Sequence, residues 1–69
     1  MQVSARNLIP GKVKKITLGA VNAEVLIEAP GGVEIVSIIT INSVERMGLK
    51  EGSQVKAMVK ASNVMVVTE

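Results

Sequence analysis

Two runs of alternating apolar and polar residues, 20–28 and 33–41, lie on either side of an Ala-Pro-Gly-Gly sequence at 29–32. Alternation with a period of two is typical of a strand with one buried face, and a Pro-Gly pair between two such runs is typical of a hairpin. The predicted buried face of the first run carries Val21, Ala23, Val25 and Ile27. Because this hairpin takes up the centre of a 69-residue chain, we predict one small, mostly β domain over residues 1–69.

The second run has a reverse face that is too apolar for water. One face carries Val33, Ile35, Ser37, Ile39 and Ile41, and the other carries Glu34, Val36, Ile38 and Thr40. Since Val36 and Ile38 would stand in water on that second face, we predict that another subunit covers it. A single core in a chain of 69 residues leaves a small margin of stability, which also favours oligomerisation or ligand binding.

The rest of the chain is predicted to add further strands and one short helix. Pro10 and Gly11 are expected to interrupt the chain before a strand at 12–18, and Gly19 is expected to form the turn after that strand. The additional strands are expected at 12–18, 54–61 and 63–68, with a short one around Val3. Apart from the short strand around Val3, the five longer strands with one short helix after the third suggest an OB-like β-barrel.

The helix is expected over residues 43–47. Asn42 is a favourable N-cap, and Glu45 three residues later completes a capping box. Gly48 is placed to stop the helix, because glycine adopts the left-handed conformation that ends many helices.

The missing residue types exclude several classes of function. The chain has no Cys and no His, its aromatic fraction is 0%, and its sequence contains no Asp. Disulfides, zinc sites and the usual pairs of nucleophile and base therefore cannot form. We expect a protein that is not an enzyme, with no organic cofactor and no directly ligated metal.

The charge pattern leaves a nucleic-acid hypothesis open. The formal net charge is +2, and Lys12, Lys14 and Lys15 are the only local group of cations. An OB-like barrel with such a group is a possible nucleic-acid binder, but the aromatic side chains on which bases stack are absent. No apolar run is long enough to span a bilayer, and the N-terminus lacks the apolar core of a signal peptide, so we expect a cytoplasmic protein without membrane contact.

Two short polar clusters near the chain ends have the chemistry of an anion site. Ser4-Ala5-Arg6-Asn7 and Lys60-Ala61-Ser62-Asn63 each combine a cation, a hydroxyl, an amide and a small alanine, and neither contains a carboxylate. Such donors, with the main-chain N–H groups near Ala5 and Ala61, suit a tetrahedral oxyanion. The alternative, which local sequence alone favours, is that Arg6 and Lys60 are ordinary surface cations and the serines are turn residues.

Thr40 and Ser43 flank the start of the predicted helix. Their hydroxyls and the free N–H groups there are candidates for a second half of the same site. The alternative is that Asn42 or Ser43 only caps the helix, and capping and anion contact can coexist.

These segments together resemble the molbindins, small cytoplasmic proteins with a single molybdate-binding TOBE/Mop domain. The same domain ends molybdate-responsive transcription regulators and some transporter ATPases. The resemblance rests on Ser-Ala-Arg-Asn at 4–7 in combination with Lys-Ala-Ser at 60–62, and it extends over 10–13, 19–25, 40–49 and 59–65. It departs at Leu8-Ile9-Pro10, where a more polar stretch is usual in the family.

The resemblance implies an OB-like barrel, dimers that exchange strand contacts, and a homohexamer built as a trimer of dimers. Molybdate or tungstate would be held between subunits. One subunit would supply Ser4, Ala5, Arg6, Lys60 and Ala61, with Ser62 beside them, and its neighbour Thr40 and Ser43. A further oxyanion site near the three-fold axis would use the backbone of Gly19, Ala20 and Val21.

The leading hypothesis is therefore non-catalytic binding of molybdate or tungstate for intracellular molybdenum storage or homeostasis. The first alternative is a small OB-fold nucleic-acid-binding protein, which would show strong, salt-dependent binding to an oligonucleotide. The second is a purely structural interaction module, whose oligomer would be indifferent to oxyanions.

Overall fold

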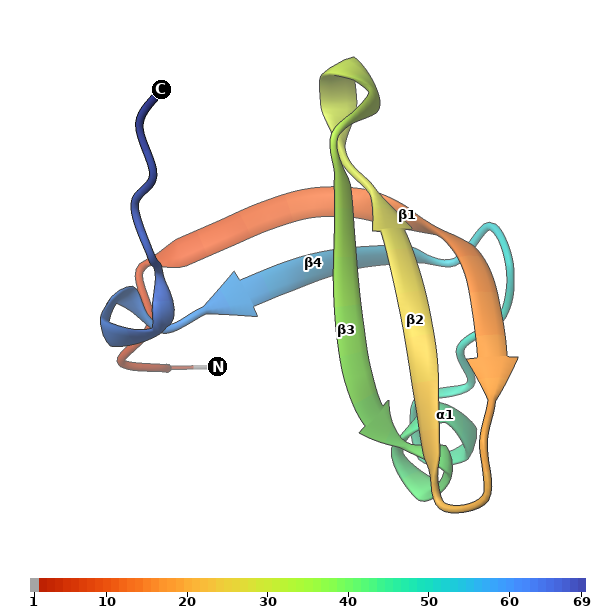
Figure 1. Cartoon of the computed structure of the whole chain (residues 1–69). Helices are drawn as coiled ribbons and strands as arrows, with labels where there is room; N and C mark the ends of the chain where they lie inside the picture. Colours follow the sequence, from red (N-terminus) through yellow and green to blue (C-terminus); the bar gives the residue numbers. More distant parts are fainter. Residues whose placement is uncertain (1) are drawn as a thin grey trace.

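The computed structural model describes residues 2–69 as one curled antiparallel sheet with a short helix beside it (Figure 1). The strands are β1 (Asn7–Leu18), β2 (Asn22–Glu28), β3 (Glu34–Thr40) and β4 (Gln54–Val59), the helix is α1 (Ile41–Met47), and two 3-10 turns are η1 (Pro30–Gly32) and η2 (Ala61–Asn63). The sheet order is β3-β2-β1-β4. The mostly β prediction is confirmed, but the prediction of five strands is wrong, because the described residues form four.

The central hairpin forms as predicted. β2 and β3 pair in register from Glu28 with Glu34 to Asn22 with Thr40. Backbone φ angles of 82° at Gly31 and 81° at Gly32 turn the chain between the two strands, and glycine adopts such angles without steric cost.

β1 is one continuous strand, so the predicted break at Pro10 and Gly11 is wrong. The strand changes partner along its length: 7–12 pair with β4, and 12–18 pair with β2. At Pro10 only one edge of β1 is paired, so the missing N–H is tolerated there. A Cβ on Gly11 would lie 2.6 Å from the backbone oxygen of Glu28, so glycine allows β1 to pass close to the end of β2.

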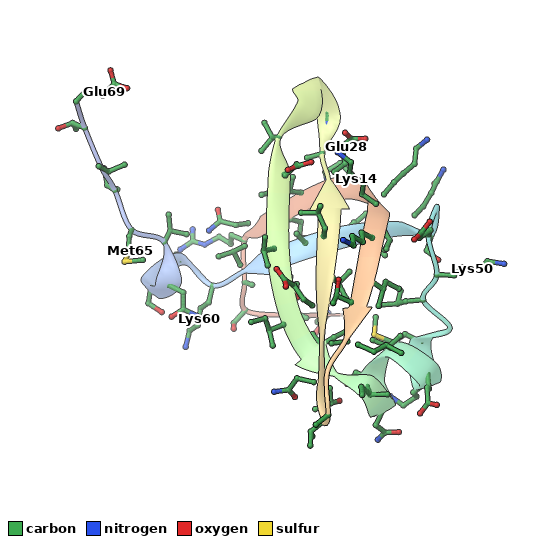
Figure 2. All side chains as sticks on the ribbon, turned by 45° about the vertical axis from the view of Figure 1, so that its right-hand side comes forward. Lys14, Glu28, Lys50, Lys60, Met65 and Glu69 are labelled. Atoms are coloured by element: carbon green, nitrogen blue, oxygen red, sulfur yellow. The ribbon has the colours of Figure 1, made fainter. Side chains whose placement is uncertain are left out.

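A bulge in β1 directs one lysine to the end of the hairpin where η1 connects β2 to β3. The register with β2 shifts between Val13 and Lys15, and Lys14 is the extra residue. Lys14 Nζ lies 2.7 Å from Glu34 Oε2 and 3.9 Å from Glu28 Oε2 (Figure 2). The hydrogen bond and charge of Glu34, with the charge of Glu28, raise the pKa of Lys14 above its usual value.

The core is small and lies on the inner face of the curled sheet. Its buried members are Val13, Ala23, Val25, Ile27, Val44 and Ala57. The predicted buried face of the first hairpin strand is thus confirmed except at Val21, which precedes β2 and is 69% exposed. On β3, Ile35 and Ile39 are half-buried against this core, and Val36 and Ile38 face outward.

The helix begins two residues earlier than predicted, at Ile41, and Asn42 is not its N-cap. Thr40 has an extended backbone, and its hydroxyl accepts the N–H of Ser43, so Thr40 caps the helix and the predicted capping box does not form. Gly48 ends the helix in the left-handed conformation, as predicted. In residues 2–69 no helix has the length and apolar character needed to cross a membrane.

Both chain ends lack the predicted strands. Val3 precedes β1 without strand structure, β4 ends at Val59, and residues 64–69 form no strand after η2. The tail runs away from the sheet on the side where the chain begins (Figure 1), and Met65 and Val67 are each 93% exposed. A strand needs a neighbouring edge to hydrogen-bond with, and no described segment pairs with the tail.

Candidate oxyanion-binding site

The first group of candidate residues lies where β1 begins and β4 ends. Asn7 and Val59 are partners in the antiparallel ladder, so Arg6 and Lys60 are the next residues outward on the two strands. This register brings the segments 4–7 and 60–63 together, although more than fifty residues of sequence separate them. The structure therefore places the two polar clusters at one end of the sheet.

Arg6 and Ala61 line the same surface pocket, whose volume is about 520 Å³. Its other lining residues are Asn7, Leu8, Ile9, Val59 and Val64. Ser4, Lys60 and Ser62 are outside this lining, and Figure 2 shows the side chain of Lys60 extending from η2 away from the sheet. In one copy the pocket thus holds one cation against a largely apolar wall.

The turn η2 arranges main-chain donors beside that pocket. Asn63 N–H donates to Lys60 O at 2.8 Å, and Val64 N–H donates to Ala61 O at 3.2 Å. These bonds use the last N–H groups of the turn, so the first ones, on Ala61 and Ser62, have no acceptor within it. Such N–H groups are suitable donors for an oxyanion.

The second group is at the start of α1. Thr40 Oγ1 accepts the N–H of Ser43 at 3.0 Å, and the hydroxyl of Thr40 donates to Ser43 Oγ at 2.8 Å. Thr40 is exposed and Ser43 is half-buried. The two hydroxyls are therefore held together at the surface, and the proton of the Ser43 hydroxyl remains available for another acceptor.

The third group, Gly19, Ala20 and Val21, forms the exposed turn between β1 and β2. Gly19 N–H donates to Asn22 O at 2.8 Å and closes the turn. Ile41 N–H donates to Val21 O at 2.9 Å, which joins the turn to the first residue of α1. The second and third groups are neighbours within one copy.

The structure does not bring the first group together with the second. The chain ends and η2 lie at one end of the molecule, and α1 with the β1–β2 turn lies at the other (Figure 1). A single copy therefore presents two separate sets of donors.

Sequence reasoning missed the apolar wall of the Arg6 pocket. Leu8, Ile9 and Val59 line it from the strands, and Val64 lines it from the tail. The only sequence feature that could have indicated this apolar wall was Leu8-Ile9-Pro10, where the family usually has a more polar stretch. Among the described residues, no group of three or more carboxylate, His or Cys side chains is arranged to hold a metal ion.

Comparison with known proteins gives consistent matches over nearly the whole chain. The model of the TOBE domain family matches residues 3–66. Molybdenum-pterin-binding protein 2 of Clostridium pasteurianum is 48% identical over 66 residues, covering 96% of this chain and 97% of that protein.

Two solved structures agree in fold. A molybdate-binding protein from Sporomusa ovata superposes with a TM-score of 0.93 at 38% identity, over 99% of this chain and 100% of that one. The cytoplasmic molybdate-binding protein ModG, in a form with molybdate bound, gives a TM-score of 0.91 at 49% identity. This match covers 94% of this chain and 46% of the ModG chain.

Proposed function

This chain belongs to the TOBE domain family, together with the molybdenum-pterin-binding proteins, and from that membership we propose that it binds molybdate or tungstate reversibly. The bound oxyanion is released unchanged, so the protein stores molybdenum and buffers its free concentration. The chain has no His, Cys or Asp to act on a substrate, which supports binding without catalysis. ModG is described as cytoplasmic, and this supports the same location here.

The observation that carries the proposal is the pairing of the two polar clusters by the β1–β4 ladder. Arg6 and Lys60 bring two permanent cations to one end of the sheet, and Ser4, Ser62 and the N–H groups of η2 add neutral donors. Neither cluster contains a carboxylate that would repel an oxyanion. Charge-assisted hydrogen bonds from such donors suit a divalent tetrahedral anion.

The site is completed by a second copy. Within one copy, α1, whose start carries Thr40 and Ser43, lies at the opposite end of the molecule from the start of β1 and the end of β4 (Figure 1), so both sets contact the same anion only across an interface. One copy supplies Ser4, Ala5, Arg6, Lys60, Ala61 and Ser62, and the other supplies Thr40 and Ser43. The turn of Gly19, Ala20 and Val21 donates to a further oxyanion.

The unpaired tail supports assembly by strand exchange. Between the free edges of β3 and β4 lies an apolar slot of about 250 Å³, lined by residues such as Ile35, Ile39, Leu49 and Val55. The tail of the same chain, with Val66 87% exposed, runs away from the sheet (Figure 1). We assign the slot to the tail of a second copy, which supplies the missing fifth strand in a dimer, and three such dimers form a homohexamer.

Isothermal titration with four anions tests the function. Molybdate and tungstate should release heat when they bind to the assembled protein. Sulfate should bind less well, because it is too small to reach all donors of the site. Protonated phosphate should bind less well, because the two clusters offer no carboxylate to accept its proton. An absence of heat with molybdate on a folded oligomer would overturn the proposal.

The nucleic-acid alternative is not favoured. The relatives named above are described by molybdenum or molybdate, and the chain has no aromatic side chain on which a base could stack. A single-stranded oligonucleotide added in the same titration should give no heat.

A further inference from the structure

One face of the paired strands β1 and β4 combines cations with exposed apolar side chains. Figure 1 shows the two strands side by side where they extend away from the β2–β3 hairpin. Every second residue of both strands is exposed on this face. The exposed cross-strand pairs are Leu8 with Met58, Pro10 with Lys56 and Lys12 with Gln54. We call these residues the arm face, and none of them carries a carboxylate.

The two lysines of the arm face have no ion-pair partner among the described residues. The ion pairs within residues 2–69 involve Lys14, whose Nζ lies 2.7 Å from Glu34 Oε2 and 3.9 Å from Glu28 Oε2. Lys12 and Lys56 are both exposed. The arm face therefore presents two positive charges that no carboxylate of the same copy neutralises.

Two adjoining hollows give the arm face a concave shape. The first has a volume of about 460 Å³ and is lined by Pro10, Gly11, Gln54, Val55 and Lys56. The second, of about 520 Å³, shares Pro10, Gly11 and Gln54 with it. It continues past Lys12 to η1, where Glu28 lies beside Lys14. Because Gly11 has no side chain, the hollows are open to each other where they meet.

The spacing of the arm-face groups matches an extended peptide. Lys12 and Lys56 are diagonal neighbours across the β1–β4 ladder, so their Cβ atoms lie about 7 Å apart. Met58 is two residues beyond Lys56 on β4. Side chains two residues apart on an extended chain are separated by about 6.5 Å, because each residue advances the chain by about 3.3 Å. Two carboxylates and one apolar side chain at alternate positions therefore face the two lysines and the methionine in order.

We propose that the arm face docks an acidic, extended segment of a partner protein, with acidic, acidic and apolar residues at alternate positions. A second copy of this chain does not fit, because its sequence has no two glutamates spaced two residues apart. A nucleic acid fits less well, because the exposed Leu8 and Met58 offer nothing to a phosphate backbone and no aromatic side chain is present for a base.

Docking on the arm face places the partner beside the proposed oxyanion site. Leu8 belongs to the arm face and also lines the pocket that contains Arg6. A partner held there is positioned to receive an oxyanion from this protein, and this role rests on the proposed function.

Titration of the assembled protein with synthetic peptides, followed by amide NMR shifts at low ionic strength, tests the docking. The probe is the peptide Ser-Glu-Ser-Glu-Ser-Leu-Ser, and the control peptide carries glutamine in place of both glutamates. The probe should shift the amide signals of Gly11 and Gln54 and bind about three-fold or more tightly than the control, since exposed ion pairs contribute modestly and are screened by salt. No shift at these amides, or equal binding of both peptides, would overturn the proposal.

The double variant Lys12→Gln with Lys56→Gln should bind the probe about three-fold or more weakly than wild type. Lys50→Gln is the matched control, because it removes an exposed cation beyond α1 and should leave probe binding unchanged. Equal probe binding by the double variant and wild type would overturn the docking. So would tighter binding of a single-stranded oligonucleotide than of the probe, or loss of the oligomer in the double variant, which would make the arm face an interface between copies.

Molybdate titration of the same variants separates this proposal from the proposed function. The double variant should bind molybdate as wild type does, because neither lysine is among the proposed oxyanion donors. A wild type that binds molybdate but not the probe overturns the docking alone, whereas a wild type that binds no molybdate contradicts the proposed function.

Discussion

Asn7 and Val59 face each other in the ladder of β1 and β4, and this pairing sets Arg6 and Lys60 at the same end of the sheet. The two cationic segments are thus positioned by backbone hydrogen bonds, with no need for a contact between their side chains. In the proposed site, the ladder would fix the main-chain donors, and the long cationic side chains would close on the anion.

Replacing Lys60 should weaken molybdate binding more than replacing Ser62. A hydrogen bond to a charged group contributes roughly 1.5–3 kcal/mol, against roughly 0.5–1.5 kcal/mol for a neutral one. Titration calorimetry should therefore show a loss of about ten-fold or more for Lys60→Ala and a smaller loss for Ser62→Ala. Lys50→Ala, an exposed cation beyond α1, is the control and should bind as wild type does. Equal affinities for Lys60→Ala and wild type would refute the assignment.

Thr40→Val should lower the stability of the protein even without molybdate. Its hydroxyl accepts the Ser43 N–H at 3.0 Å, and loss of such a cap costs about 1 kcal/mol. Urea unfolding in anion-free buffer measures this cost, and Thr40→Ser should restore most of it because serine keeps the acceptor. If Thr40→Ser is as unstable as Thr40→Val, the cap is not the cause.

Gly11→Ala should reduce both stability and affinity. The new Cβ would lie 2.6 Å from Glu28 O and 2.9 Å from Ile27 Cγ2, and such overpacking costs about 1–3 kcal/mol. Relief of this clash displaces the part of β1 that leads to Arg6, so molybdate binding should weaken as well.

Gly32→Ala separates that effect from a general loss of stability. A Cβ there meets nothing within 4 Å, but φ of 81° strains an alanine. This variant should unfold more easily and bind molybdate as tightly as wild type. Equal losses of affinity in both glycine variants would contradict the role given to Gly11.

Removing residues 63–69 should abolish assembly. These residues carry Val64, Met65, Val66 and Val67, all exposed in one copy, and the proposed dimer buries them in the slot between β3 and β4. Light scattering should find wild type as a hexamer and the truncated chain as a monomer, and removal of Glu69 alone should change nothing. A truncated chain that still forms hexamers would exclude strand exchange.

The central hairpin was predictable because its signals are local. The alternation through Ala23, Val25 and Ile27 matches the residues that are buried, and the glycines at the turn have the positive φ that the connection needs. The continuity of β1 was not predictable from local sequence. Pro10 is tolerated in this strand only because a single edge of the strand is paired there. The strand expected at 63–68 failed for a related reason, since an apolar pattern forms a strand only beside an edge.

The candidate site residues remain a prediction from their chemical types, and only their arrangement comes from the structure. Sequence identified Arg6, Lys60, Thr40 and Ser43 as donors. The ladder register that brings Arg6 near Lys60, and the distance that separates both from Thr40, depend on the path of the whole sheet. The bond from Ile41 to Val21 has no local signal either, since it joins segments that meet only after the hairpin forms.

Anomalous diffraction from a crystal grown with molybdate distinguishes a site shared between copies from a site within one copy, because the anomalous signal of molybdenum locates the bound anion directly. For a site shared between copies, we expect a peak between the Arg6 and Lys60 segments of one copy and the Thr40 and Ser43 segment of another. A peak held by one copy alone, or no peak beside Lys60, would contradict it.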